Sequence, residues 1–212
     1  MKKILILAVM MLTLCGCSNV RKSSIDTITK NSLNGKMIKP NEVRVGYKFY
    51  KPSLMSVTNS TKYNEVLRCN EFNYYLYVDL VSYYNKADIT YDENDISYYS
   101  KKISHKNKKG FIEINEIKDN QYLIEIMYNY AKIEVRVDEK HIKEAVSYSL
   151  SVLTSIRYND KVIENTMGKD AFNGTEETVN IFKTVGSEKN HLQYVEDSKF
   201  DKDVIPDMDL IN

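Results

Sequence analysis

The sequence predicts an α+β fold: a single domain in which an antiparallel sheet of about five or six strands packs against a long helix in the C-terminal half. Three observations favour this fold. Short runs of alternating apolar and polar residues follow one another closely between residues 96 and 137, as in an antiparallel meander. Between residues 138 and 156 the apolar period lengthens to about 3.6 residues, as in a helix with one buried side. The chain has 212 residues, enough for one domain with an appended segment.

The first residues have the layout of an export signal. Lys2 and Lys3 form a charged start, residues 4–14 are apolar without interruption, and small residues follow. As a helix the apolar run spans only ~16 Å, about half of a ~30 Å hydrocarbon core. It is too short to cross a membrane, and we expect residues 1–16 to be a signal peptide that is removed.

Leu14, Cys15, Gly16 and Cys17 follow the apolar run. This segment resembles the lipobox of bacterial lipoproteins, in which a leucine, two small residues and an invariant cysteine mark the cleavage site. Cys17 is the matching cysteine, because lipidation of Cys15 would put Leu14 where the family has a small residue. The resemblance, which covers residues 1 to about 18, implies a diacylglyceryl group on Cys17, and two acyl chains give stable anchoring. The alternative is an ordinary secretory signal.

The same resemblance implies a mature protein that is lipid-anchored at the outer face of the cell membrane. Ser18 follows Cys17, where the inner-membrane retention signal of Gram-negative lipoproteins has aspartate. Abundant Lys, Asn, Ile and Tyr with few Gly and Pro are typical of an A+T-rich genome, as in low-GC Gram-positive bacteria. Residues 17–40 are mostly polar, and we expect a flexible, lipidated tether that lifts the domain off the membrane.

The first strands are predicted from two apolar runs. In residues 43–49, Val43, Val45, Tyr47 and Phe49 alternate with polar or small residues, so they are expected to share one face of a strand. Residues 72–84 have apolar side chains at both odd and even positions, which predicts a central strand covered on both sides. Four further strands are predicted, over residues 96–103, 110–117, 121–128 and 131–137.

The long helix is predicted to begin at Asp138, a plausible N-cap. Its apolar stripe should lie across the sheet and supply much of the core. The residues of this stripe are Ile142, Ala145, Val146, Ser149, Leu150, Leu153 and Ile156. A short helix is predicted over residues 176–185. We assign residues 41–190 to the α+β domain and residues 191–212 to an acidic tail that is extended or disordered.

The order of these elements resembles the exported domains of the PsbP and Mog1 type. The resemblance rests on an early strand that ends near Pro52 and on a late helix that ends in Leu153-Thr154-Ser155-Ile156. It implies a binding or assembly role rather than catalysis. A likeness of fold does not identify a ligand.

Charge and cysteine content narrow the class of function. The formal net charge is +1, and removal of Lys2 and Lys3 makes the mature chain slightly negative. The net charge of the mature chain is therefore not the positive charge by which a protein attracts nucleic acid. After lipidation of Cys17, Cys69 is the one cysteine left, which excludes an internal disulfide. Burial is the usual role of such a thiol, with an intermolecular cross-link or a nucleophile as alternatives.

No metal site or cofactor is expected. His105, His141 and His191 are far apart and lack partners at metal-ligand spacing. Acidic residues gather at 92–95 and at 201–209, but neither group has the spacing of a calcium-binding loop.

We expect the protein not to be an enzyme. The signatures of serine hydrolases, zinc proteases and phosphate-binding loops do not occur in the sequence. Glu113, Glu116, Glu125 and Glu134 could be paired across strands for hydrolysis. The ordinary interpretation is that they lie on the solvent-facing side of a sheet.

Tyrosine gathers in two adjoining strand-like runs. Its flat ring and hydroxyl suit recognition of proteins or glycans, although tyrosine is also a common strand residue. Alternate residues of a strand face opposite sides, so we expect some of these rings to reach solvent. The predicted contact residues are Tyr74, Tyr75, Tyr77, Tyr83, Tyr84, Tyr98 and Tyr99, with Tyr91 in the same region.

A basic segment ends at Gly110. It could bind anionic lipid or wall polymer, since each cation near a charged surface contributes about 1 kcal/mol before salt screening. A solvated hairpin loop is the ordinary alternative. The predicted contact residues are Lys101, Lys102, Lys106, Lys108 and Lys109, beside His105.

Together these observations favour a non-catalytic, membrane-anchored envelope lipoprotein whose domain binds or helps to assemble another envelope component. An envelope protein is the expected partner, and nucleic acid is not. The first alternative is a module that binds wall polymer or anionic lipid through the basic segment. A hydrolase is the weaker alternative, since it would need a concave cluster of Glu or His with perturbed pKa values.

Overall fold

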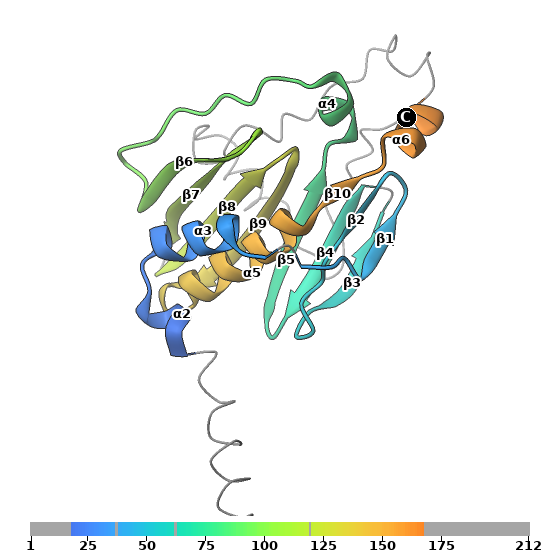
Figure 1. Cartoon of the computed structure of the whole chain (residues 1–212). Coiled ribbons are helices and arrows are strands. Elements are labelled where there is room, and N and C mark those ends of the chain that lie inside the picture. Colours follow the sequence, from blue (N-terminus) through green and yellow to red (C-terminus); the bar gives the residue numbers. More distant parts are fainter. Residues whose placement is uncertain (1–17, 37, 62, 119, 168–212) are drawn as a thin grey trace, which may run out of the picture.

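The computed structural model describes residues 18–36, 38–61, 63–118 and 120–167. Within these ranges the main layer is a seven-stranded antiparallel sheet in the order β3-β4-β5-β9-β8-β7-β6. Helices α3 (Ile25–Asn34) and α5 (Ile142–Ser155) lie on one face of this sheet (Figure 1). The predicted α+β class and the long packing helix are confirmed, and the sheet has more strands than expected.

Four consecutive strands form the predicted meander. They are β6 (Tyr99–His105), β7 (Lys108–Lys118), β8 (Gln121–Tyr128) and β9 (Ala131–Asp138), each antiparallel to the next. Asn129 and Tyr130 both have positive φ, as a two-residue type I′ turn requires. The predicted start of β6 is wrong, because Ile96 is 95% exposed and the strand begins at Tyr99.

Strand β5 (Phe72–Val78) lies between β4 (Asn64–Cys69) and β9. It buries one face only, so the prediction of a strand covered on both sides is wrong. The predicted extent is also wrong, since Asp79 ends the strand. The Asp79 carboxylate accepts a hydrogen bond from the backbone N of Ser82 at 2.8 Å and caps helix α4 (Leu80–Asn85). Strands β3 (Ser56–Ser60) and β4 were not predicted.

The predicted strand over residues 43–49 is instead a hairpin of β1 (Glu42–Arg44) and β2 (Tyr47–Phe49). Gly46 turns the chain with φ of +87°, and a Cβ there would lie 2.8 Å from Cδ1 of Leu80. The valines therefore do not share a face with the aromatic residues. Tyr47 and Phe49 are buried, whereas Val43 is 74% exposed. Strand β10 (Arg157–Tyr158) completes a small sheet in the order β1-β2-β10.

Residues 18–34, predicted to be flexible tether, form helices α2 (Ser18–Lys22) and α3. The Ser24 hydroxyl accepts a hydrogen bond from the backbone N of Thr27 at 3.1 Å and caps α3. Ile28 is buried in the core, with Ile25 and Leu33 packed against it. These three residues form a narrow apolar stripe on an otherwise polar helix, and this stripe docks the segment.

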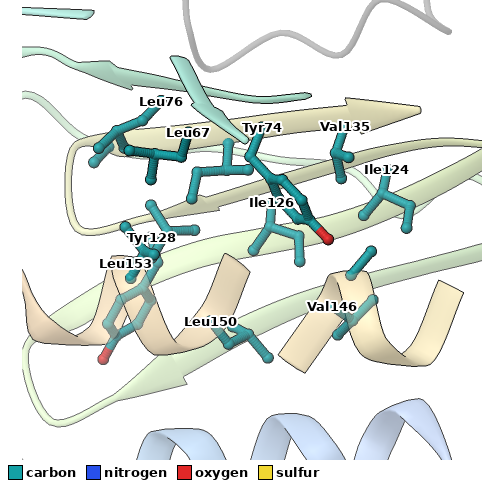
Figure 2. Packing of buried hydrophobic residues seen from close by; sticks show 14 of the residues in the cluster. Leu67, Tyr74, Leu76, Ile124, Ile126, Tyr128, Val135, Val146, Leu150 and Leu153 are labelled. Atoms are coloured by element: carbon teal, nitrogen blue, oxygen red, sulfur yellow. The ribbon is translucent and has the colours of Figure 1, made fainter. Parts of the chain in front are cut away.

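Helix α5 carries the predicted apolar stripe into the core. Figure 2 shows Val146, Leu150 and Leu153 of the helix facing the sheet, with Leu153 beside Tyr128 and Val146 on the side of Ile124. Burying a side chain of this size contributes about 1.5–3 kcal/mol. The predicted N-cap is wrong: Asp138 makes no side-chain cap bond, and a 3₁₀ turn, η2 (Glu139–His141), precedes the helix.

Helix α6 (Asp160–Met167) follows β10 and ends the described chain. The helix predicted over residues 176–185 and the acidic tail over 191–212 lie outside the described residues, as does the signal peptide. Among the helices that the structure describes, none combines the length and the apolar character needed to cross a bilayer.

Candidate functional site

The segment next to the predicted lipidation site is joined to the domain. Helix α2 begins at Ser18, and Cys17 itself lies outside the described residues. The Nε of Arg21 donates to Oε1 of Glu144 on α5 at 2.8 Å. The Nζ of Lys143 donates to the backbone oxygen of Arg21 at 3.0 Å. Two side chains of α5, those of Lys143 and Glu144, thus hold this short helix in place.

Helix α3 is tied to the edge of the sheet in the same way. Asp26 forms an ion pair with Lys101 of β6 and accepts a hydrogen bond from the Tyr99 hydroxyl at 3.1 Å. The hydrogen bond from Lys101 is the largest influence that lowers the pKa of Asp26. The start of the domain therefore has contacts with both α5 and β6.

The predicted contact tyrosines lie in different environments. Tyr74 is only 2% exposed and belongs to the core, so it cannot contact a partner in this conformation. Tyr75 and Tyr77 are half-buried on the face of the sheet that is opposite to α5, here called the far face. Tyr99 is half-buried and bonded to Asp26.

Tyr83 belongs to an aromatic cluster that joins α4, α6 and β10. Its ring stacks on Tyr158 with centroids 3.8 Å apart, and its hydroxyl donates to Asp160 at 2.8 Å. Burial and the bond to Asp160 raise the pKa of Tyr83 to about 12. Of the predicted set, Tyr84 and Tyr98 are the well-exposed rings, at 38% and 52%.

Three of the four glutamates are aligned across the sheet, but two of them are not on a solvent-facing side. Glu113 of β7 is opposite Glu125 of β8, which is opposite Glu134 of β9. Glu113 and Glu125 are buried, at 1% and 0% exposure. The expectation of exposed carboxylates is therefore wrong for this pair and holds for Glu116.

Lys132 balances the charge at one end of this row. Its Nζ lies 2.7 Å from Oε1 of Glu125 and 2.7 Å from Oε1 of Glu134. Burial, the largest influence, lowers the pKa of Lys132, but Glu134 and Glu125 together outweigh it and the net shift is upward. Lys132 therefore keeps its proton and acts as a counter-ion to the carboxylates.

Glu113, at the other end of the row, is held by neutral donors. The Tyr91 hydroxyl donates to Oε2 at 2.5 Å, and Nδ2 of Asn115 donates to Oε1 at 2.9 Å. The Tyr91 ring stacks on Phe111 with centroids 4.3 Å apart. Burial and the bond to Glu113 raise the pKa of Tyr91. These contacts fasten the segment of residues 86–98 over the far face and give the glutamate row a structural role.

The predicted basic residues lie on the β6–β7 hairpin, but three of them are already paired. Lys101 pairs with Asp26, Lys102 with Asp92 at 3.5 Å, and Lys109 with Asp88 at 2.8 Å. Lys106 and Lys108 have no carboxylate within ion-pair distance in the described part of the chain. The free positive charge of the hairpin is thus concentrated at its turn.

These two lysines border a pocket of about 550 Å³. The pocket lies between the hairpin turn, the C-terminal end of α3 and the last turns of α5. No acidic side chain of the described residues lines it. The lining consists of Asn31, Ser32, Leu33, Asn34, Gly35, Lys36, Ile38, His105, Lys106, Asn107, Lys108, Tyr128, Ser151 and Thr154.

Arg157 is not a lining residue but contacts one, Thr154, and it was not found by sequence reasoning. Its Nη1 donates to the carbonyl oxygens of Thr154 at 3.2 Å and of Ile156 at 2.7 Å, while its Nη2 is buried and has no hydrogen-bond partner among the described residues. Burial lowers the pKa of Lys108, and the like charges of Arg157 and Lys106 lower it further. Lys36 lines the pocket together with Lys106 and Lys108, and Arg157 lies next to the lining residue Thr154. Four cations are therefore in or beside its wall, which makes this pocket the candidate functional site.

Cys69 and the histidines do not form a reactive cluster in the described residues. Cys69 is buried at 3% exposure, and burial, followed by Glu144 and Glu71, raises the pKa of its thiol. His141 is half-buried and packs edge-on against Phe72, with centroids 4.9 Å apart. No group of three or more metal-ligating side chains occurs within the described ranges.

Comparisons with known proteins give no relative from which to transfer a role. No protein-family model matches the chain, and no curated protein sequence matches it. The function is therefore argued from the chain's own residues.

Proposed function

We propose that this protein is a non-catalytic, lipid-anchored component of the bacterial cell envelope whose domain binds another envelope component. The observation that carries the proposal is the position of the lipobox-like cysteine. Cys17 directly precedes Ser18, the first residue of a helix that is docked on the domain. Consecutive Cα atoms are about 3.8 Å apart, so a lipid on Cys17 would join the membrane to the folded part without a spacer.

Such a junction would orient the domain. In this proposal the end of the domain that carries α2 and the start of α5 faces the bilayer. Helix α5 has 14 residues and rises about 1.5 Å per residue, so its last turn stands roughly 20 Å farther out. The pocket bordered by Thr154 would then open at the membrane-distal end, where envelope components outside the membrane can reach it.

A protein partner is supported by apolar side chains that solvent reaches. Ile96 is 95% exposed and Tyr98 is 52% exposed, both at the end of the segment 86–98 that Tyr91 fastens to the sheet. Aromatic side chains, tyrosine among them, contribute a large share of the binding energy in protein interfaces. Of the predicted tyrosine set, Tyr98 is the best placed for such a contact.

Cross-linking in cells tests this function. The lipidated protein is cross-linked in its native envelope, purified, and the attached material is identified by mass spectrometry. We expect one envelope protein to be recovered reproducibly, and to be lost in the variant Ile96→Ser/Tyr98→Ser. Val43→Ser, at an apolar residue on the other sheet that is 74% exposed, should retain it. Recovery of wall polymer or lipid alone would contradict the protein-partner proposal.

A further inference from the structure

We propose that the pocket between α3, α5 and the β6–β7 hairpin binds a phosphate group, with Lys106, Lys108 and Arg157 supplying the positive charge. The proposal deepens the envelope-binding function by adding a ligand class and a site. It rests on that function only for the source of the phosphate, an anionic envelope polymer. The binding chemistry itself follows from the side chains at the pocket.

The charge at the pocket lacks a counter-ion in the described part of the chain. The neighbouring lysines of the same hairpin show the contrast: Lys101, Lys102 and Lys109 each have an aspartate partner. Lys106 and Lys108 have none, and the pocket wall contains no described Asp or Glu. A bound anion would supply the missing negative charge.

The C-terminal ends of α3 and α5 carry partial negative charge, but this charge balances only part of the positive charge at the pocket. A helix end carries roughly half an elementary charge, so two ends balance about one cation. Arg157 already serves in this way, since its Nη1 donates to Thr154 and Ile156 at the end of α5. Lys106 and Lys108 make no such bonds, and their charge is left for a ligand.

Arg157 also has an unused donor. Its Nη2 is buried and has no hydrogen-bond partner within the part of the chain that the structure describes, although buried donors in proteins are almost always satisfied. Two residues of the lining connect this guanidinium to the pocket. Thr154 accepts a bond from it, and Lys108 is close enough for the like charges to lower the pKa of Lys108. An anionic oxygen in the pocket would relieve the repulsion between Lys106, Lys108 and Arg157, and a ligand that extends beyond Thr154 could also reach the free donor.

Phosphate fits this set of donors better than other anions do. It presents several acceptor oxygens and no required donor, and arginine and lysine are its usual protein partners. The side-chain amides of Asn31 and Asn107 add neutral donors at the rim. Leu33, Ile38 and Tyr128 give the pocket an apolar wall, against which the carbon atoms of a glycerol or sugar unit can pack. The volume of about 550 Å³ lies in the range of ordinary ligand pockets.

The position of the pocket indicates a polymer rather than a headgroup as the source. Arg21 of α2 contacts Glu144, whereas Thr154 borders the pocket ten residues later on the same helix. This separation corresponds to about 15 Å along the helix. With Cys17 anchored, the headgroups of the same membrane would lie at the α2 end, and a phosphodiester polymer that extends into the wall would reach the pocket.

Titration calorimetry tests the proposal with the full-length, lipidated protein in a non-ionic detergent. The probe is a soluble poly(glycerol phosphate), and vesicles of phosphatidylglycerol and soluble polyglutamate are the comparison probes. We expect the phosphate polymer to bind, and Lys106→Gln/Lys108→Gln to weaken binding by at least about tenfold, because two charged hydrogen bonds are lost. Lys109→Gln, which removes one positive charge from a residue of the same hairpin that is paired with Asp88, should change the affinity less than about twofold.

Arg157→Gln should weaken binding to a similar degree. If Arg157→Gln does not fold, the lysine double variant still tests the site, because it leaves β10 unchanged. Three results would overturn the proposal: no heat of binding with the polymer, equal losses in Lys109→Gln and the lysine double variant, or equal binding of polyglutamate. Binding to phosphatidylglycerol vesicles but not to the polymer would assign the site to headgroups and overturn the polymer source. None of these results bears on acylation of Cys17 or on protein cross-linking, so a failure here is separate from a failure of the proposed function.

Discussion

Arg21 of α2 donates from Nε to Oε1 of Glu144 on α5 at 2.8 Å, across 123 positions of the chain. This contact, with Ile28 of α3 in the core, means that the segment after the predicted lipidation site is part of the folded domain. The ion pair is exposed and contributes little by itself, about 0–1 kcal/mol. The buried stripe of α3 is the main source of docking energy.

Replacing Ile28 by alanine should therefore release α3 without unfolding the sheet. Loss of a buried isoleucine side chain costs about 2–5 kcal/mol, more than a short two-helix segment can offset. Hydrogen exchange measures the effect: amides of residues 25–34 should lose protection, while those of β8 keep theirs. Lys30→Ala, on the exposed side of α3, is the control. Unchanged protection of α3 in Ile28→Ala would contradict the docked arrangement.

The ion pairs of Lys132 predict that a single variant is destabilised more than a double variant. Lys132→Met should destabilise the protein by about 3–5 kcal/mol, because it leaves Glu125 buried without its counter-ion. Lys132→Met/Glu125→Gln should be less destabilised than the single variant, since the buried charge is also removed. Urea denaturation gives both free energies of unfolding. A double variant as unstable as Lys132→Met would show that the pair is not the source of the effect.

Stability should fall at alkaline pH through Tyr47, which is buried, and the half-buried Tyr77 and Tyr158. Burial, the first cause in each case, raises the pKa values of Tyr47, Tyr77 and Tyr158 above the ordinary value. The folded state holds these protons more tightly, so their stabilisation is complete below the unfolded pKa of about 10 and is lost as the pH rises from there towards the folded values. Lys132 acts in the same direction above about pH 10.4, since its folded pKa is also raised.

Free energies of unfolding in urea between pH 8 and pH 11, a range set by the ordinary pKa of tyrosine near ~10, check this dependence. We expect a flat region below about pH 9.5 and a steep fall above it. Tyr158→Phe should flatten the fall, at the cost of the 2.7 Å hydrogen bond to the Asn129 carbonyl. A wild-type protein whose stability is constant to pH 11, roughly one pH unit above that pKa, would contradict the burial of these hydroxyls.

Gly110 is predicted to be the least replaceable glycine of the sheet. A Cβ at this position would lie 2.0 Å from the backbone oxygen of Met127 on β8, so the β7–β8 ladder would have to open. We expect Gly110→Ala to destabilise the protein by about 3 kcal/mol or more. The exposed residue Ser104, on the neighbouring strand β6, is the matched control as Ser104→Ala. Equal midpoints in thermal denaturation for both variants would argue against this close approach.

Periodicity predicted the elements that have a long apolar run or a clear apolar stripe. Strand β8 has the predicted bounds, and the apolar stripe of α5 lies in the core as expected. Where one or two residues determine whether a segment folds as a helix or a hairpin, the apolar periodicity did not predict the structure. Ile28 docks α3 although the surrounding composition is polar, and one glycine, Gly46, converts an alternating run into a hairpin.

Only some residues of the candidate site could be predicted from the sequence. The basic residues Lys106 and Lys108 stand out as a charge run, but the pairing of Lys101 and Lys109 with Asp26 and Asp88 depends on tertiary contacts. Arg157 approaches the same pocket from the end of α5, far along the chain. No spacing rule connects these positions, because the fold alone brings them together.

Acyl labelling tests the central claim, that lipid on Cys17 anchors a domain docked immediately behind it. Cells that express the wild type, Cys15→Ala and Cys17→Ala are grown with a labelled fatty acid, and the protein is isolated from the membrane fraction. Wild type and Cys15→Ala should carry the label and sediment with membranes, while Cys17→Ala should be unlabelled. Label that persists in Cys17→Ala, or an unlabelled wild type, would contradict the anchor and with it the proposed orientation of the domain.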